Sequence, residues 1–283
     1  MSLVEKIVRN GRGAPAATTT ASRPAAGERD GTAAGVIEER SFELDLAALR
    51  REGYVGGAAR NAAVSLELGE VRRRLMREVD LFNDRERRNR ACRILVTSAH
   101  PGEGKTFFAV HLAPSPAVEA AHDVLLIDAD IAKPSVLETL GLDDGPGLMD
   151  ALADPHLPVG DCLIQTDIPG LKVMPAGTGH MHDTELLASA RTEALLGQLE
   201  TGAPGRILII DSPPVLAASP AAVLAGHVGQ TIMVVRADET LESSLRDAIG
   251  LMGACPHIQL LLNGVKFSPG VRRFGTYYGQ GGA

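Results

Sequence analysis

The strongest constraint on the fold is a glycine-rich stretch that separates an apolar run from an apolar segment of helical character. The stretch reads AHPGEGKT over residues 99–106, follows the run ILVTSA and precedes FFAVHLA. Gly102 and Gly104 let the backbone curl, so that successive N–H groups point inward and form a concave site for anions. A helix that begins directly after such a loop adds the positive end of its dipole. The stretch therefore predicts a phosphate-binding loop between a strand and a helix.

The residues that end this loop carry the expected chemistry. Lys105 is spaced to reach the β- and γ-phosphates of a nucleoside triphosphate, and the Thr106 hydroxyl can bind Mg²⁺. The motif begins with Ala99 rather than Gly, a variant that alters no hydrogen-bond donor. We therefore predict that the chain binds a nucleoside triphosphate with Mg²⁺. The residues expected to contact the nucleotide in this stretch are Gly102, Glu103, Gly104, Lys105, Thr106 and Phe107.

Short apolar runs alternate with helical segments through most of the remaining chain. Several of these runs are apolar without alternation, which is typical of parallel strands covered on both faces. The pattern predicts an α/β fold with a doubly wound, mostly parallel sheet, in a domain over residues 93–268. The expected strands are 94–99, 124–130, 171–177, 207–211, 231–238 and 258–263, and the expected helices are 105–113, 184–200, 218–227 and 239–253.

Acidic residues stand at the ends of two apolar strands. The run VLLIDAD leaves Asp128 and Asp130 at its carboxyl end, and ILIID leaves Asp211 at the end of another. Ligands of open parallel sheets bind outside the carboxyl ends of the strands, so these acids and the phosphate-binding loop are expected to converge. A carboxylate there can hold Mg²⁺ or accept a proton from an attacking hydroxyl.

The two ends of the chain differ from the domain in composition. Residues 1–57 are expected to be largely disordered, because the Ala-, Gly- and Pro-rich part has too few apolar residues to offset the entropy of ordering. Residues 58–92 are expected to form a helix followed by an Arg-rich connector. Residues 269–283 are expected to form a flexible tail, which contains Tyr277 and Tyr278.

Composition limits the class of function and the compartment. The formal net charge of −7 argues against nucleic-acid binding, which favours basic domains. The cysteines Cys92, Cys162 and Cys255 show no CxxC spacing, which predicts reduced thiols in a cytoplasmic protein. No apolar run approaches the ~18 residues that span a bilayer. His180 and His182 lie close together but have no companion ligand, so an exposed loop is the better interpretation than a metal site.

The segments SAHPGEGKT, VLLIDADIAKPS and ILIIDSPP together resemble the bacterial tyrosine kinases, which are P-loop NTPases. The resemblance continues in TDIPGLKVMPAG, TELLASAR and LLNGV, and in the terminal FGTYYGQGG. It is dense over residues 93–265. With the opening MSLVEKIV, the chain is also similar to the subgroup associated with exosortase-linked exopolysaccharide clusters.

The resemblance implies a cytoplasmic autokinase that transfers the γ-phosphate of ATP to tail tyrosines, here Tyr277 and Tyr278, and that regulates exopolysaccharide synthesis or export. It also implies a membrane-embedded chain-length determinant protein as partner, peripheral association with the inner face of the plasma membrane through that partner, homo-oligomers and a cognate tyrosine phosphatase. For the site, it implies that Asp128 is a metal ligand or general base, that Asp130 and Asp211 organise the metal, and that Asn263 lies near the adenine.

Three features depart from the family pattern, one of which is the tail, with only two tyrosines where relatives often have more. Pro114 and Pro116 fall where relatives have apolar helix formers, and an internal proline costs about 3 kcal/mol or more. The helix after the loop is therefore expected to stop or bend near Leu112. Relatives also carry Glu-x2-Arg-x2-Arg/Lys before the domain, whereas the nearest match here starts at Glu70 and has Met76 at the third position.

Two other functions fit parts of the sequence. A partitioning or septum-positioning ATPase shares the fold class, but such proteins carry a signature lysine where this chain has His100. A histidine supplies no permanent positive charge there. The second alternative is a non-catalytic module that binds ATP and signals its occupancy to a membrane partner.

Overall fold

The computed structural model describes residues 41–42, 62–80, 89–114, 123–203 and 205–265. The tail tyrosines Tyr277 and Tyr278 lie outside the described residues, as does nearly all of the segment expected to be disordered. Among the described residues, no helix combines the length and the apolar character needed to cross a membrane.

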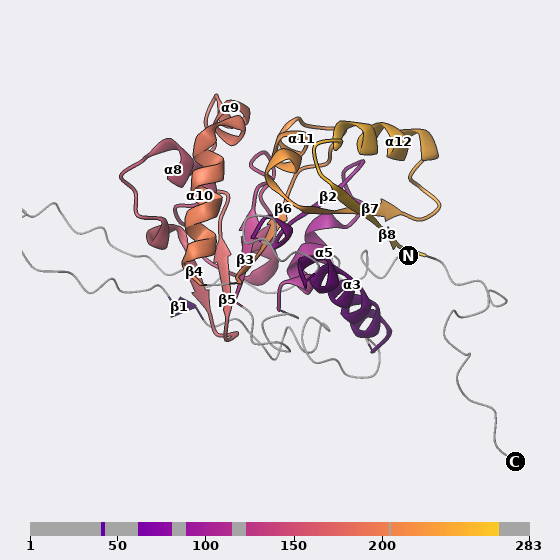
Figure 1. The fold of residues 1–283 in the computed structure, drawn as a ribbon, viewed down its shortest axis with the longest axis horizontal. Helices are drawn as coiled ribbons and strands as arrows, with labels where there is room; N and C mark the ends of the chain where they lie inside the picture. The colour runs from indigo at the N-terminus through magenta and orange to yellow at the C-terminus, as the bar shows by residue number, and fades with distance from the viewer. Residues whose placement is uncertain (1–40, 43–61, 81–88, 115–122, 204, 266–283) are drawn as a thin grey trace, which may run out of the picture.

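A sheet of eight strands forms the centre of the molecule, in the order β1-β4-β5-β3-β6-β2-β7-β8 (Figure 1). All neighbouring strands pair in parallel except β4 and β5, which pair antiparallel. The predicted fold class is therefore confirmed. The strands are β1 Ser41–Phe42, β2 Arg93–Ser98, β3 Val124–Asp128, β4 Ile164–Thr166, β5 Leu171–Met174, β6 Ile207–Asp211, β7 Gln230–Arg236 and β8 His257–Asn263.

Helices cover both faces of the sheet, which explains why β2, β3 and β6 are buried along their whole length. Successive residues of these strands point into two separate hydrophobic clusters. Leu95 packs in the cluster under α8 to α12, and Val96 packs with α3, α5 and α7. The helices are α3 Ala62–Asp80, α5 Lys105–Leu112, α7 Val136–Leu140, α8 Leu148–Ala153, α9 Asp183–Ala188, α10 Ala190–Thr201, α11 Pro220–Leu224 and α12 Glu242–Leu251, with short 3-10 turns η1 Val159–Cys162 and η2 Ala225–His227.

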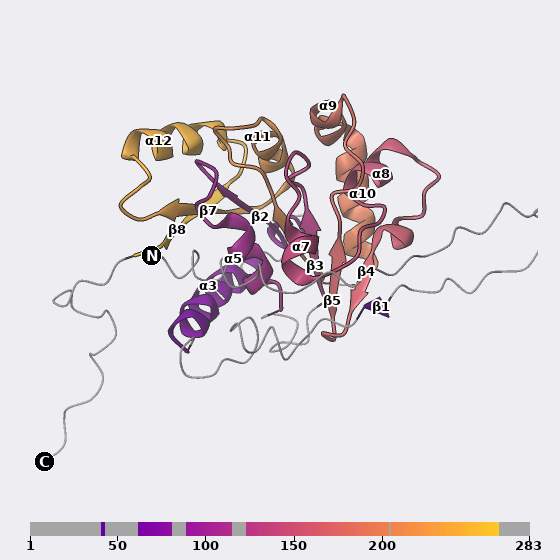
Figure 2. The same ribbon diagram turned by 180° about the vertical axis from the view of Figure 1, so that it is seen from behind.

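The helix after the phosphate-binding loop ends where the sequence predicts. Helix α5 stops at Leu112, and Pro114 follows two residues later. Proline has no backbone N–H to continue the helical hydrogen bonds. Figure 2 shows α3 lying beside α5, and Leu75 of α3 belongs to the same buried cluster as Leu112. Pro116 lies outside the described residues.

Short elements are where the sequence interpretation differs from the fold. Strand β4 and helices α7 and α8 have only 3, 5 and 6 residues, too few to show a hydrophobic period. The helix expected over 184–200 is divided at Ser189, whose backbone is extended. The Ser189 hydroxyl donates to the Leu186 carbonyl oxygen at 2.6 Å, a local bond that competes with helix continuation.

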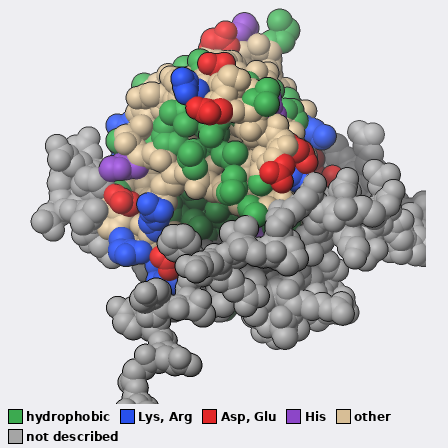
Figure 3. Space-filling model, turned by 90° about the vertical axis from the view of Figure 1, so that its right-hand side faces the viewer, with side chains coloured by type: hydrophobic (Ala, Val, Ile, Leu, Met, Phe, Trp, Pro, Cys, Tyr) green, Lys and Arg blue, Asp and Glu red, His purple; other side chains and the backbone are tan. Residues whose placement is uncertain are grey.

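Strand β8 forms one edge of the sheet. On the side of the molecule where β8 and α12 lie, hydrophobic side chains gather at the surface (Figure 3). Leu260 and Leu262, on one face of β8, are 56% and 62% exposed.

Candidate functional site: a phosphate-binding loop and three strand ends

The loop between β2 and α5 takes a backbone shape that requires glycine. Gly102 has φ 82° and Gly104 has φ 100°, a region that residues with a Cβ rarely adopt. A Cβ on Gly104 would also lie 2.3 Å from Asn263 Nδ2. Gly104 caps the N-terminus of α5, and its carbonyl oxygen accepts from the Phe108 N–H at 3.0 Å. The loop therefore has the shape that the motif predicts, with the positive end of α5 behind it.

Glu103, the residue between the two glycines, is held by contacts within its own loop, with the turn after β7 and with the end of β8. The Glu103 carboxylate accepts from the His100 N–H at 2.9 Å and from the Thr240 hydroxyl. Asn263, at the end of β8, donates its side-chain N–H to the Glu103 carbonyl oxygen at 2.8 Å. Sequence reasoning did not single out Thr240, because nothing in the local sequence indicates a partner 137 residues away.

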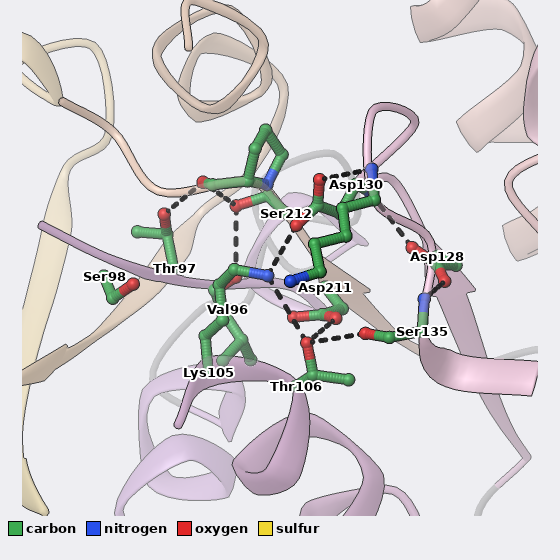
Figure 4. Close-up of polar contacts among 12 residues, drawn as sticks. Val96, Thr97, Ser98, Lys105, Thr106, Asp128, Asp130, Ser135, Asp211 and Ser212 are labelled. Carbon is green, nitrogen blue, oxygen red and sulfur yellow. Dashed lines mark hydrogen bonds and ion pairs between the residues drawn. The ribbon is translucent and has the colours of Figure 1, made fainter. Parts of the chain in front are cut away.

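The parallel order of β3, β6 and β2 brings the predicted acids beside the loop (Figure 4). Asp128 and Asp211 are register partners on β3 and β6, and Asp211 pairs in turn with Val96 on β2. The carboxyl ends of strands that are far apart in the sequence thus meet at one edge of the sheet. The prediction that Lys105 and Thr106 lie beside the acids at the strand ends is confirmed.

Lys105 points across this edge toward the acids (Figure 4). Its Nζ lies 2.6 Å from Asp130 Oδ2, and the two side chains are only 11% and 7% exposed. Nζ also donates to Thr106 Oγ1 at 3.3 Å. Asp130 is itself oriented, since its Oδ1 accepts from the Lys133 N–H at 3.3 Å. The ion pair holds a buried ammonium group in the site.

Asp211 is buried beside Thr106 and has a free oxygen. The Thr106 hydroxyl donates to Asp211 Oδ2 at 2.6 Å, and the Ser135 hydroxyl lies 3.4 Å from Thr106 Oγ1. Asp211 Oδ1 is buried and has no hydrogen-bond partner within the described residues. Burial raises the pKa of Asp211 to about 7, against the opposing effects of Lys105 and Thr106.

The donor set at Asp211 fits a magnesium ion. Mg²⁺ prefers hard oxygen ligands and is usually held by one or two carboxylates together with phosphate oxygens and water. An orphaned carboxylate oxygen next to a threonine hydroxyl supplies such ligands. No group of three or more His, Cys, Asp or Glu side chains that could hold a metal occurs in the described part of the chain. His180 and His182 are exposed in their loop, in agreement with the sequence interpretation.

Asp128 is held by backbone donors rather than by side chains. Its Oδ1 accepts from the Asp130 N–H, and its Oδ2 accepts from the N–H groups of Ser135 and Val136, all at 3.0 Å. Burial raises the pKa of Asp128, and these hydrogen bonds oppose the shift. Asp128 thus fixes the turn that carries Asp130. Ser135 was not predicted from the sequence; its hydroxyl donates to Thr106 and makes no capping hydrogen bond to α7.

Two further predicted residues lie near the loop. Phe107 follows Thr106 on α5, and its ring centroid is 3.7 Å from that of His111. Asn263 contacts the loop backbone through Glu103. Their expected roles in nucleotide binding, the latter near the adenine, stay predictions. The predicted metal-binding and catalytic roles of the acids also stay predictions.

Comparison with known proteins gives several bacterial tyrosine-protein kinases as sequence relatives. No family model matches the sequence. The tyrosine-protein kinase YwqD of Bacillus subtilis is 30% identical over 177 residues, which cover 62% of this chain and 73% of YwqD. EpsB of Ralstonia nicotianae, also named as a tyrosine-protein kinase, is 31% identical over 192 residues, which cover 66% of this chain and 25% of EpsB. The chain thus spans about a quarter of the length of relatives such as EpsB.

Solved structures agree with the sequence relatives. The BceF tyrosine kinase domain superposes with a TM-score of 0.57 at 29% identity, over 68% of this chain and 75% of that domain.

Proposed function

Because the chain belongs to the bacterial tyrosine-protein kinases, we propose that it transfers the γ-phosphate of ATP to Tyr277 and Tyr278 of its own C-terminal tail. The observation that carries the proposal is the convergence of Lys105, Thr106 and Asp211. Their hydrogen bonds join the phosphate-binding loop to a neighbouring strand end. Phosphoryl transfer depends mainly on positioning and on charge neutralisation, and this arrangement supplies both.

The loop and α5 bind the phosphates through backbone N–H groups, and Lys105 neutralises the β- and γ-phosphates. Asp130 keeps the Lys105 ammonium in the site before nucleotide arrives, as their 2.6 Å contact suggests. Thr106 and Asp211 would hold Mg²⁺, with Asp128 as a further ligand or as the general base. When bound, that ion offsets the negative charge of the phosphate oxygens.

Asp128 accepts the proton of the tyrosine hydroxyl in the proposed reaction. The acid lies at the end of β3, next to Asp130, which pairs with the Lys105 ammonium. Its raised pKa favours proton acceptance relative to an exposed carboxylate. To take part, Asp128 exchanges one of its backbone hydrogen bonds for the tyrosine hydroxyl.

The proposed cellular role is regulation of exopolysaccharide synthesis or export. The partner is a membrane-embedded polysaccharide chain-length determinant protein, which brings the kinase to the inner face of the plasma membrane as a homo-oligomer. Each phosphate adds about 1.5–2 negative charges to the tail, which weakens its attraction to a site rich in carboxylates. A cognate phosphatase resets the tail. The family resemblance supports these proposals, and the exosortase-linked assignment rests on the same resemblance.

Peptide mass spectrometry after incubation with MgATP tests the proposed reaction. The wild-type protein is compared with Lys105→Met and with Tyr277→Phe/Tyr278→Phe. We expect phosphate on the two tyrosines of the wild type, none in the Lys105 variant and none on the tail of the double variant. Tight ATP binding without phosphate transfer, even with the cytoplasmic segments of the membrane partner added, would instead favour the non-catalytic ATP-binding module.

A further inference from the structure

Glu103 is a carboxylate inside a loop whose backbone shape suits phosphate. Its side chain is buried, with 4% of the residue exposed. A negative charge aimed into the cradle would repel phosphate oxygens. The side chain is instead turned to one side, where the His100 N–H and the Thr240 hydroxyl donate to its two oxygens. Glu103 therefore makes its polar contacts within the protein.

The donor on Thr240 is itself oriented. Its hydroxyl oxygen accepts from the Arg236 N–H at 3.0 Å, which leaves the hydroxyl proton to point at Glu103. The Thr240 N–H closes the same turn by donating to the Arg236 carbonyl oxygen at 3.0 Å. Within this turn Asp238 has φ 63°, a conformation that a non-glycine residue rarely adopts. Two hydrogen bonds between Arg236 and Thr240 thus fix the turn after β7, which places the Thr240 hydroxyl next to the phosphate-binding loop.

Sheet order indicates which part of a nucleotide this contact borders. The phosphate-binding loop follows β2, which lies between β6 and β7. Asp211 and Asp130 follow β6 and β3 on the other side of the loop, where Thr106 contacts Asp211 and Lys105 contacts Asp130. Since the terminal phosphate and its metal belong on that side, the nucleoside extends over the ends of β7 and β8. These are the ends that carry Thr240 and Asn263.

We propose that Glu103 is a positioning residue that locks the phosphate-binding loop to the turn after β7 and so couples the nucleoside side of the site to its phosphate side. The inference rests on the proposed function for the identity of the ligand. Its geometric core, the contacts of Glu103 with His100 and Thr240, is independent of any ligand. A loop held in its binding shape before nucleotide arrives loses less entropy on binding.

Three variants separate positioning from general stability. Glu103→Ala removes both acceptors. Thr240→Val removes one donor with little change in volume. Glu103→Gln keeps an acceptor for the His100 N–H but turns an amide donor toward the Thr240 hydroxyl, so it is expected to fall between the wild type and Glu103→Ala. Glu239→Gln is the matched control, because Glu239 lies in the same turn but is 68% exposed and pairs with Arg236.

The first measurement is amide hydrogen exchange of the full chain without nucleotide. We expect Glu103→Ala to speed exchange both in the loop and in the turn over 236–241, and Thr240→Val to speed exchange in the loop. Glu239→Gln is expected to leave loop exchange close to wild type, and Glu103→Gln is expected to fall between the wild type and Glu103→Ala. Unchanged loop exchange in Glu103→Ala and in Thr240→Val would overturn the proposal.

The second measurement is calorimetric titration with MgATP and with magnesium tripolyphosphate, which has no nucleoside. Glu103→Ala and Thr240→Val are each expected to weaken ATP binding about tenfold, and tripolyphosphate binding less. The double variant is expected to be no weaker than either single variant. An equal loss of affinity for MgATP and for magnesium tripolyphosphate would overturn the proposed coupling between the nucleoside side and the phosphate side of the site. If the variants show faster loop exchange but the wild-type protein binds no ATP, the positioning role of Glu103 is supported and the proposed function is refuted.

Discussion

Replacing Gly104 with alanine tests the geometry of the phosphate-binding loop most sharply. Gly104 combines φ 100° with a predicted Cβ position 2.3 Å from Asn263 Nδ2. Gly102 has φ 82° in the same loop but nothing within 4 Å of such a Cβ. Gly141, which caps α7 away from the loop, has φ 69° and equally open space. Comparing the three alanine variants therefore distinguishes three effects: the strain of a positive φ, the clash with Asn263, and the position of the residue inside the phosphate-binding loop.

The expected costs follow from these differences. An alanine at positive φ costs about 1–2 kcal/mol at each position. At Gly104 the new methyl group also displaces Asn263 from the Glu103 carbonyl oxygen, a hydrogen bond of 2.8 Å that contributes about 1 kcal/mol. The total for Gly104→Ala is about 2–3 kcal/mol. If the loop relaxes to relieve this strain, ATP binding must restore the cradle, and affinity falls by about 30- to 160-fold.

Calorimetric titration with MgATP, together with urea unfolding of each variant, measures both parts of this cost. We expect Gly141→Ala to lose stability while it binds ATP like the wild type. Gly102→Ala is expected to weaken ATP binding about 5- to 30-fold, and Gly104→Ala is expected to weaken it most. Equal ATP affinity for Gly104→Ala and Gly141→Ala would refute the claim that the loop shape forms the phosphate site.

Three further predictions concern stability, pH and the metal. Arg93→Met leaves the buried Glu200 without its 2.5 Å partner, so urea unfolding should show a loss of about 3 kcal/mol that Glu200→Gln partly restores. Burial lowers the pKa of His111 from 6.5 to about 4, so the unfolded chain protonates first and stability falls by about 3 kcal/mol as pH drops from 7 to 4. His111→Leu should remove that part of the pH dependence, and an unchanged profile would contradict it. Thr106→Val removes the hydroxyl beside Asp211, so it should weaken ATP binding in Mg²⁺ more than in EDTA.

The sequence contains enough information to predict the centre of this fold. The strands β2, β3 and β6 are apolar runs that end in a loop or in an aspartate, so their carboxyl ends were expected to meet at one edge. The contacts of Lys105, Thr106 and Asp211 agree with that expectation. Pro114 likewise indicated where α5 ends.

Other features depend on contacts that local sequence does not contain. The Glu103 contact with Thr240 joins residues 137 positions apart, and only the strand order makes them neighbours. Ser189 lies inside an apolar period typical of one long helix, yet its hydroxyl bonds to the preceding turn and separates α9 from α10. Strand β4 is too short for its pairing direction to be predicted. Tertiary contacts decide such elements.

Calorimetric titration of ATP into the wild type and into Lys105→Met, each in Mg²⁺ and in EDTA, tests the central claim most directly. We expect the wild type to bind ATP, and Mg²⁺ to strengthen that binding. We expect a large loss of affinity in Lys105→Met, because that variant lacks the ammonium group that Asp130 holds in the site. The account would be contradicted by a wild type that binds no ATP, or by a Lys105→Met variant that binds MgATP as tightly as the wild type.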